Sequence, residues 1–165
     1  MRYLTILRHA KSSWAQPDIS DFDRPLNARG RRDAPVMAER LLERKCIADS
    51  IVCSPAVRTR QTAELVRSGL GVSAQQVDFD ERIYEASTGT LLALVEQWPE
   101  AHSHTMLIGH NPGLEGLGAA LNHPHRHTLP TCAVLHLAID ADSWGQLQTA
   151  AISELFYDYP KSAAG

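Results

Sequence analysis

The sequence predicts an α/β fold with three layers, in which helices cover both faces of a largely parallel central sheet. Short apolar and β-branched runs alternate with segments that carry apolar residues at helical spacing, and this alternation is typical of parallel strands joined by helices. A chain of 165 residues is long enough to bury one sizeable core. We therefore expect a single domain over residues 1–160, followed by a frayed tail at residues 161–165.

The first strand and the first helix are separated by a polar segment. Residues 3–7 form a short apolar and β-branched run, which predicts a buried central strand. Residues 11–25 are polar and rich in aspartate, and we expect a functional loop there. Asn27 is a suitable cap for the helix that follows. Pro35 lies inside that helix and predicts a kink or a broken first turn.

A second strand and helix follow. Residues 50–53 are predicted to form a strand, since they are apolar and β-branched. The pair Ser54–Pro55 opens the next helix, because proline suits the first helical turn. We expect this helix to end near Ser68, where Gly69 and Gly71 interrupt it.

The alternation continues through two more strands and helices. Residues 77–79 predict a short strand, and Thr88 caps a helix that Pro99 stops. Residues 105–108 predict a strand, followed at once by a helix at residues 112–121. Asparagine and proline at positions 111 and 112 suit the cap and the first turn of this helix.

The chain closes on two strands without a helix between them. Residues 133–139 and 146–152 are predicted to form strands, because apolar residues either alternate with polar ones or follow one another over the length of a strand. A turn at residues 140–145 joins the two.

Composition limits the classes of function. The formal net charge is −3, which argues against a protein that binds nucleic acid by bulk attraction. A hydrophobic content of 44% and a charged content of 21% are ordinary for a globular protein, and no apolar run reaches the roughly 18 residues of a membrane span. We expect no signal peptide and a cytoplasmic location. The three cysteines, at wide and irregular spacing, are predicted to be reduced thiols in or near the core.

Three motifs place chemistry-bearing side chains just after predicted strands. Arg8 and His9 follow the first strand, Arg58 lies one turn into the helix after the second, and Gly109 and His110 follow a later strand. Such positions converge at one edge of a parallel sheet, where helix N-termini also favour anions. Guanidinium groups suit phosphate oxygens, and a neutral imidazole is a nucleophile toward phosphorus.

Each motif has a plainer interpretation when it is taken alone. His9 is then a core or loop histidine beside a surface charge, and His110 is a turn histidine without a role. Together, the motifs predict a phosphoryl site in which His9 attacks and His110 donates to the developing charge.

The motifs form three blocks: Arg8-His9-Ala10, then Ser54-Pro55 with Arg58 and Gln61-Thr62, then Gly109-His110. In this order they resemble the histidine phosphatase superfamily, whose fold is called phosphoglycerate mutase-like. The resemblance is strongest to the SixA-like phosphohistidine phosphatases, and it covers residues 1–121. The features that carry this finer resemblance are the short chain, Arg8-His9-Ala10-Lys11, Asp23-Arg24-Pro25-Leu26 with Gly30, and Gly109-His110-Asn111-Pro112.

The resemblance implies a role for each residue. His9 is implied to be the nucleophile that becomes phosphorylated, and Arg8, Arg58 and His110 are implied to form the phosphate pocket. Arg24 is expected to join them in binding the substrate.

One departure from the family pattern and one open question remain. Ala10 stands where the superfamily usually has glycine, a variant that is similar to the SixA-like branch. An acidic residue is expected to protonate the leaving oxygen of a phosphoester. Glu85 is the first candidate, with Asp18, Asp21 and Asp23 as competitors on the loop after His9. A phosphohistidine substrate has less need of a strong acid, because imidazole leaves more readily.

The predicted chemistry requires neither a metal nor another cofactor, since arginine and histidine supply the positive charge. Residues 123–127 contain three alternating histidines, which can bind a transition metal, but the absence of neighbouring acidic or thiol residues favours a solvent loop. No motif surrounds His102, His104 or His136, and the sequence assigns them no role.

The sequence therefore predicts a metal-independent phosphatase, most consistent with removal of phosphate from phosphohistidine on a phosphotransfer protein. Two alternatives stay open. The first is a phosphatase of small phosphoesters such as sugar phosphates or nucleotides. The second, of another class, is a non-catalytic module that binds phosphate or phosphoproteins.

Overall fold

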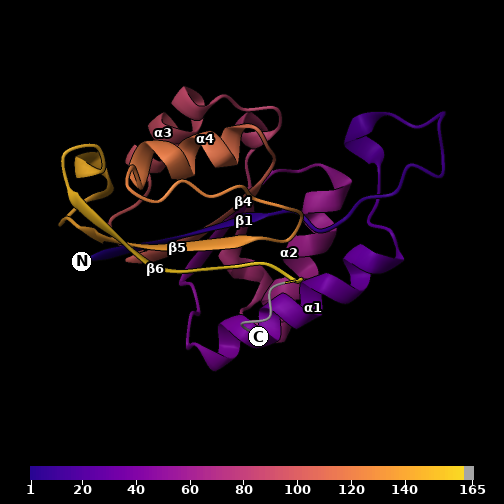
Figure 1. The fold of residues 1–165 in the computed structure, drawn as a ribbon, viewed down its shortest axis with the longest axis horizontal. Coiled ribbons are helices and arrows are strands. Elements are labelled where there is room, and N and C mark those ends of the chain that lie inside the picture. Colours follow the sequence, from indigo (N-terminus) through magenta and orange to yellow (C-terminus); the bar gives the residue numbers. More distant parts are fainter. Residues whose placement is uncertain (162–165) are drawn as a thin grey trace.

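A six-stranded mixed sheet forms the centre of the protein, as the computed structural model of residues 1–161 shows (Figure 1). The strand order is β3-β2-β4-β1-β5-β6. The first four are mutually parallel, whereas β5 runs antiparallel to β1, and β6 antiparallel to β5. The predicted α/β class with a largely parallel sheet is confirmed. The strands are β1 (Arg2–Arg8), β2 (Ser50–Cys53), β3 (Val77–Phe79), β4 (His104–Gly109), β5 (Val134–Asp140) and β6 (Ala151–Asp158).

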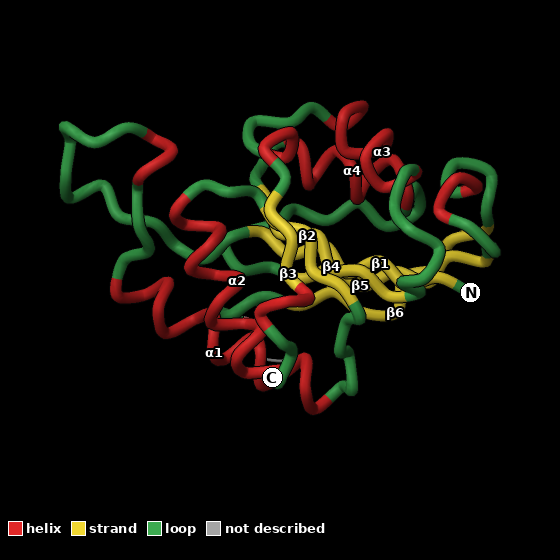
Figure 2. The backbone as a smooth tube through the Cα atoms, turned by 180° about the vertical axis from the view of Figure 1, so that it is seen from behind, coloured by secondary structure: helices red, strands yellow, loops and turns green. Residues whose placement is uncertain are grey.

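Four helices cover the two faces of the sheet in pairs. Figures 1 and 2 show α1 and α2 on one face and α3 and α4 on the other. None of the helices in residues 1–161 has the length and hydropathy that a bilayer crossing demands. The predicted tail, apart from its first residue, lies outside the described residues. The helices are α1 (Ala28–Glu43), α2 (Val57–Leu70), α3 (Thr88–Glu96) and α4 (Gly113–Leu121).

Alternation along each strand divides the buried side chains into two apolar cores. On β1, Leu4 and Ile6 pack in the core beneath α3 and α4, whereas Leu7 packs in the core beneath α1 and α2. The central strand β4 behaves in the same way, with Leu107 in the first core and Met106 in the second. A strand buried on both faces is held rigidly, which fixes the residues at its carboxyl end.

The first helix differs from the prediction at its proline. Asn27 caps α1 as expected, since its side chain accepts a hydrogen bond of 2.9 Å from the backbone of Gly30. The helix then continues through Pro35 without a break. Pro35 lies on the exposed side, so the carbonyl that loses its helical partner faces water. The expected broken turn was therefore wrong.

The second helix extends further than predicted. It runs through Gly69 and ends at Leu70, followed by Gly71 in the left-handed conformation with φ of 73°. A Cβ on Gly69 would lie 2.6 Å from the Cβ of Ala38 in α1. Gly69 therefore permits close packing of the two helices rather than ending one of them.

Further boundaries were misplaced. α2 begins at Val57 rather than at Ser54–Pro55, and Pro112 rather than Asn111 takes the cap position of α4. The cap of α3 is Ser87, one residue before the predicted Thr88, and its hydroxyl accepts from the backbone of Thr90 at 3.1 Å. The last strand runs from Ala151 to Asp158 rather than over residues 146–152, and residues 144–146 form a 3₁₀ turn before it. Trp144 in this turn is buried in the core, where its indole N–H donates to a backbone carbonyl. Burial of this ring overrides the local preference for a strand.

Candidate active site

The carboxyl ends of three adjacent parallel strands bring the predicted residues together. His9 directly follows β1, His110 directly follows β4, and Arg58 lies in the first turn of α2, after β2. The rings of His9 and His110 are 5.3 Å apart between centroids. The Nε of Arg58 lies 3.4 Å from Nε2 of His9. All three residues are less than 10% exposed.

His9 is held with one ring nitrogen, Nε2, unprotonated. Its Nδ1 lies 2.7 Å from the carbonyl oxygen of Ala10, and because a carbonyl only accepts, Nδ1 carries the proton. Nε2 therefore presents its lone pair toward Arg58. Burial, helped by the positive charges of Arg58 and Arg8, lowers the pKa of His9 to about 3. The result is a neutral imidazole in the tautomer that a nucleophile needs.

The backbone that carries His9 is tied to α2 and α1. The Ala10 N–H donates to the hydroxyl of Thr62 at 3.0 Å, and that hydroxyl donates to the carbonyl of Arg58 at 2.8 Å. On the other side, a Cβ on Gly30 would lie 2.2 Å from the carbonyl oxygen of Lys11. The segment after His9 thus rests directly on the backbone of α1, which only glycine allows.

His110 is fixed by a residue whose contact the sequence did not reveal. Its Nε2 lies 2.8 Å from the hydroxyl of Ser54. The same hydroxyl accepts from the Ala56 N–H at 3.3 Å, and within residues 1–161 Nε2 of His110 is the acceptor in reach of its hydrogen, so we assign the hydroxyl as the donor to Nε2. Nδ1 of His110 therefore carries a proton, and it is buried without a hydrogen-bond partner in residues 1–161. Burial and the charge of Arg58 lower the pKa of His110 to about 4.

Arg8 adds a second donor without a partner. One terminal nitrogen of Arg8 donates to the carbonyl of Leu129 at 3.0 Å. Its Nε is buried and, within residues 1–161, has no acceptor. Two buried donors left open beside a neutral imidazole are unusual, because unpaired buried donors are costly. An anion would satisfy both.

Asp21, from the loop after β1, lies across the site as an anion. Its carboxylate accepts from the hydroxyl of Tyr84 at 2.6 Å and from Arg58 at 3.1 Å. Arg24 donates to the other carboxylate oxygen at 3.0 Å. These hydrogen bonds, that of Tyr84 first, lower the pKa of Asp21 to about 2. The loop projects at the sheet edge where β1 ends (Figure 1).

Arg24 is part of the same loop and is 7% exposed. Its guanidinium donates to the hydroxyl of Ser12 at 2.6 Å and lies 3.6 Å from the ring centroid of Trp14. Trp14 is itself 73% exposed, so it covers Arg24 from the solvent side. Asp21 links this arginine to Arg58, because each arginine binds one of its carboxylate oxygens.

The remaining carboxylates lie at the rim. Glu85 is exposed and adopts a left-handed backbone with φ of 56° directly after Tyr84, whose ring packs edge-on against His110 at 5.4 Å. Asp23 accepts from the neighbouring Ser20 hydroxyl at 2.9 Å, and Asp18 is exposed in a turn. Of the four acidic candidates, Asp21 makes hydrogen bonds with the residues around the phosphate pocket.

The histidine-rich loop at residues 123–127 lies between α4 and β5. Nε2 of His127 lies within hydrogen-bond distance of the Glu154 carboxylate, at 2.6 Å, and its ring stacks on Tyr157. In the part of the chain that the structure describes, residues 123–127 contribute no ligand to a group of three metal-binding side chains.

A family model described as the histidine phosphatase superfamily, branch 1, matches residues 4–116, which is more than half of the chain and includes every residue that meets at the sheet edge. The chain belongs to the histidine phosphatase superfamily. The predicted family is thereby confirmed. As expected for a member of this superfamily, the pocket is lined by arginine and histidine at the carboxyl ends of the strands.

Relatives in sequence and in structure agree with this membership. An uncharacterized protein of Mycobacterium tuberculosis is 28% identical over 94% of this chain and 100% of its own length. A crystal structure from Agrobacterium tumefaciens, assigned as the phosphohistidine phosphatase SixA, matches with a TM-score of 0.82 and 28% identity over 96% of this chain and 98% of that chain. SixA in complex with tungstate shares the fold with a TM-score of 0.81 at 21% identity, over 96% of this chain and 97% of that chain.

Proposed function

We propose that this protein is a phosphatase that acts through a covalent phosphohistidine on His9. The observation that carries the proposal is the pairing of a neutral His9, whose unprotonated Nε2 faces Arg58, with two buried donors on Arg8 and His110 that have no partner within residues 1–161. In the first step, the Nε2 lone pair of His9 forms a bond to phosphorus while the bond to the leaving atom breaks. Water then attacks the phosphoenzyme, which returns inorganic phosphate and neutral His9.

Charge in the pocket supports this chemistry. Arg58 lies against Nε2 of His9, so its guanidinium is placed beside the position of a phosphoryl group on that nitrogen. The N–H groups of Arg8 and His110 stabilise the equatorial oxygens in the transition state. In this proposal the guanidinium groups supply the positive charge that a metal supplies elsewhere. An incoming phosphate dianion displaces the Asp21 carboxylate from Arg58. The carboxylate keeps its hydrogen bond with Arg24.

Glu85 is the proton donor in this scheme. Asp21 is held as an anion by Tyr84 and two arginines, with a pKa of about 2, so it has no proton to give near neutral pH. We therefore propose Glu85, an exposed carboxyl directly after Tyr84, because it makes no such hydrogen bonds within residues 1–161. A leaving imidazole takes its proton from Glu85 or from water.

The proposed substrate is phosphohistidine on a protein. Similarity to the structure assigned as SixA from Agrobacterium tumefaciens supports this choice. The alternative is a small phosphoester: a mycobacterial glucosyl-3-phosphoglycerate phosphatase has the same fold, with a TM-score of 0.65 and 18% identity. A panel of phosphohistidine peptide, phosphoserine peptide and sugar phosphate, compared by kcat/KM, separates the two. A higher kcat/KM for the sugar phosphate would favour the alternative.

The mechanism is tested by replacing His9 with alanine and incubating the protein with ³²P-labelled substrate. We expect turnover and labelled phosphoenzyme to be lost together, with the melting temperature retained, because the nucleophile is removed. His125→Ala, a substitution of an exposed histidine outside the site, is the matched control and keeps both. Turnover that survives in His9→Ala overturns the mechanism. Absence of turnover from the wild-type protein, together with tight phosphate binding, would instead favour a non-catalytic binding module.

A further inference from the structure

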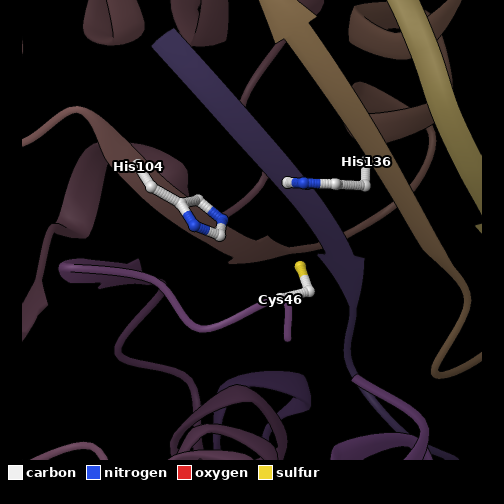
Figure 3. Close-up of side chains that lie close together, drawn as sticks. All are labelled: Cys46, His104 and His136. Carbon is white, nitrogen blue, oxygen red and sulfur yellow. The ribbon is translucent and has the colours of Figure 1, made fainter. Parts of the chain in front are cut away.

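A second cluster of chemistry-bearing side chains lies on the face of the sheet that α1 and α2 cover. Cys46, His104 and His136 point toward one another from three separate segments (Figure 3). One ligand atom from each lies within 4.8 Å of the others. The hydroxyl oxygen of Thr5 lies among them, at 2.7 Å from Nε2 of His104, 2.9 Å from Nδ1 of His136 and 3.6 Å from the sulfur of Cys46.

Strand register assembles two of the three residues. Thr5 on β1 pairs with His136 on β5, and its neighbour Tyr3 pairs with His104 on β4. Residues two apart on a strand share a face, so the side chains from three neighbouring strands meet. A register shift between β5 and β6 lies directly after His136. Such irregularities are common beside functional sites, where they redirect a side chain.

The third residue is placed by a backbone turn at the end of α1. Lys45 adopts a left-handed conformation with φ of 57°, and the Cys46 N–H then donates to the carbonyl of Leu41 at 2.9 Å. This turn directs the Cys46 side chain back under the sheet, where it is 4% exposed.

The hydrogen bonds of the cluster suit metal ligation. One ring nitrogen of each histidine, Nε2 of His104 and Nδ1 of His136, lies within hydrogen-bond distance of the Thr5 hydroxyl in the middle of the cluster. Thr5 has a single hydroxyl hydrogen for three neighbours, so two of its contacts depend on protons from the ring nitrogens or the thiol. A bound cation replaces the thiol proton, and a ring proton that faces Thr5 moves to the other nitrogen of the same imidazole.

We propose that Cys46, His104 and His136 bind a thiophilic d¹⁰ cation, Zn²⁺ or Cu⁺. Binding forms one metal–sulfur and two metal–nitrogen bonds, releases the thiol proton of Cys46 to solvent, and displaces water from the hydrated ion. One thiolate and two imidazoles are the ligand types that these ions select. Ligand bonds of about 2.0–2.3 Å require the three atoms to close by about 1 Å.

The surroundings give the ion access. A cavity of about 430 Å³ is bordered by the three ligands, by Arg44 and Lys45, and by the side chains of β6. Both basic residues are exposed at its mouth. A single thiolate makes the Cu⁺ site neutral, whereas Zn²⁺ leaves one positive charge near these two cations. For equally strong bonds between ion and ligands, the charge balance therefore favours Cu⁺ over Zn²⁺.

This site is separate from the phosphate pocket and does not depend on the proposed function. Thr5 lies on β1 four residues before His9, which directly follows that strand, and four residues of extended chain correspond to about 13 Å. The cluster also opens under the sheet beside the end of α1, whereas His9 lies at the sheet edge.

The test is a competition titration of the reduced protein, stripped of metal, against a chromophoric chelator. One arm uses Zn²⁺ and the other uses Cu⁺ under anaerobic conditions. All titrations use a protein that also carries His123→Gln and His125→Gln. These substitutions remove two exposed histidines of the histidine-rich loop, which could otherwise bind metal ions nonspecifically. We expect one ion per chain in this background and a thiolate charge-transfer band when Co²⁺ replaces Zn²⁺.

Ligand variants decide the outcome. Loss of a residue that only supports a metal ligand typically lowers metal affinity by roughly 10–100-fold. Cys46→Ala and His104→Asn each remove a ligand and should lower the affinity by more than this. Cys132→Ala, which removes another buried thiol, is the control and should keep the affinity. Two ligand variants on different elements guard against one that fails to fold. Absence of stoichiometric binding in both arms, or equal affinity in Cys46→Ala, overturns the proposal and leaves a hydrogen-bonded cluster only.

Discussion

Replacing Ser54 with alanine tests how His110 is positioned. The Ser54 hydroxyl is fully buried and donates to Nε2 of His110 at 2.8 Å, which keeps the proton on Nδ1. Without that hydroxyl, Nε2 loses this partner and the ring can adopt the other tautomer. Nδ1 then presents a lone pair to the phosphoryl oxygens, which repels them. Ser54 acts through His110 and is a positioning residue.

The magnitude follows from the burial of the hydrogen bond. Leaving a buried polar group without its partner costs about 1–3 kcal/mol. Taking about 2 kcal/mol as the loss in the transition state, kcat/KM falls about 30-fold. We expect most of the change in kcat, because the lost interaction strengthens as charge develops on the phosphoryl group.

The assay is steady-state kinetics on wild type, Ser54→Ala and Ser50→Ala. Ser50 is a buried serine at the start of β2, the strand that Ser54 directly follows, so it controls for the loss of a buried hydroxyl nearby in the chain. The ¹⁵N shifts of His110 report the tautomer directly, which a merely structural role of Ser54 would leave unchanged. A kcat/KM within a factor of two of wild type, in a protein as stable as Ser50→Ala, would refute the reasoning.

Three further outcomes are expected. His9 and His110 have pKa values of about 3 and 4 in the fold but about 6.5 when unfolded, so the unfolded chain binds more protons below pH 6.5. The free energy of unfolding, measured by urea titration, should therefore fall as pH drops from about 6.5 toward 4. The expected slope is up to about 1.4 kcal/mol per pH unit for each histidine, and a flat profile contradicts this. Gly30→Ala forces a Cβ to within 2.2 Å of the Lys11 carbonyl oxygen. It should lower the free energy of unfolding in urea by about 1–3 kcal/mol and also lower kcat/KM. Unchanged stability would show that the contact relaxes freely. Asp21→Asn removes a half-exposed ion pair worth about 1 kcal/mol and should tighten inhibition by inorganic phosphate about fivefold; a collapse of kcat would instead make Asp21 the proton donor.

Local patterns predicted most of the sheet because its parallel strands are short apolar runs. The strands at residues 50–53 and 77–79 have the predicted bounds. Prediction failed where a distant contact decided the outcome. Trp144 is drawn into the core and delays the last strand, and Gly69 packs on α1 instead of ending α2.

The site divides in the same way. His9 and His110 follow apolar strands, and Arg58 follows a helix start, so periodicity and turn chemistry alone place them at the same edge. Family membership was also visible in the order of the motifs. The roles of Asp21 and Ser54 were not visible, since neither carries a local signal for its partner.

The sequence by itself determined the α/β class, the edge at which His9, Arg58 and His110 meet, and the family, because each depends on patterns within a few residues. Only the tertiary structure decided which atoms are free to react. The tautomer of His110 depends on a serine 56 residues away, and the lowered pKa of Asp21 depends first on a tyrosine 63 residues away. The cluster of Cys46, His104 and His136 likewise exists only through strand register and one turn. Hydrogen bonds and burial act over ångströms in space, and sequence spacing does not record that distance.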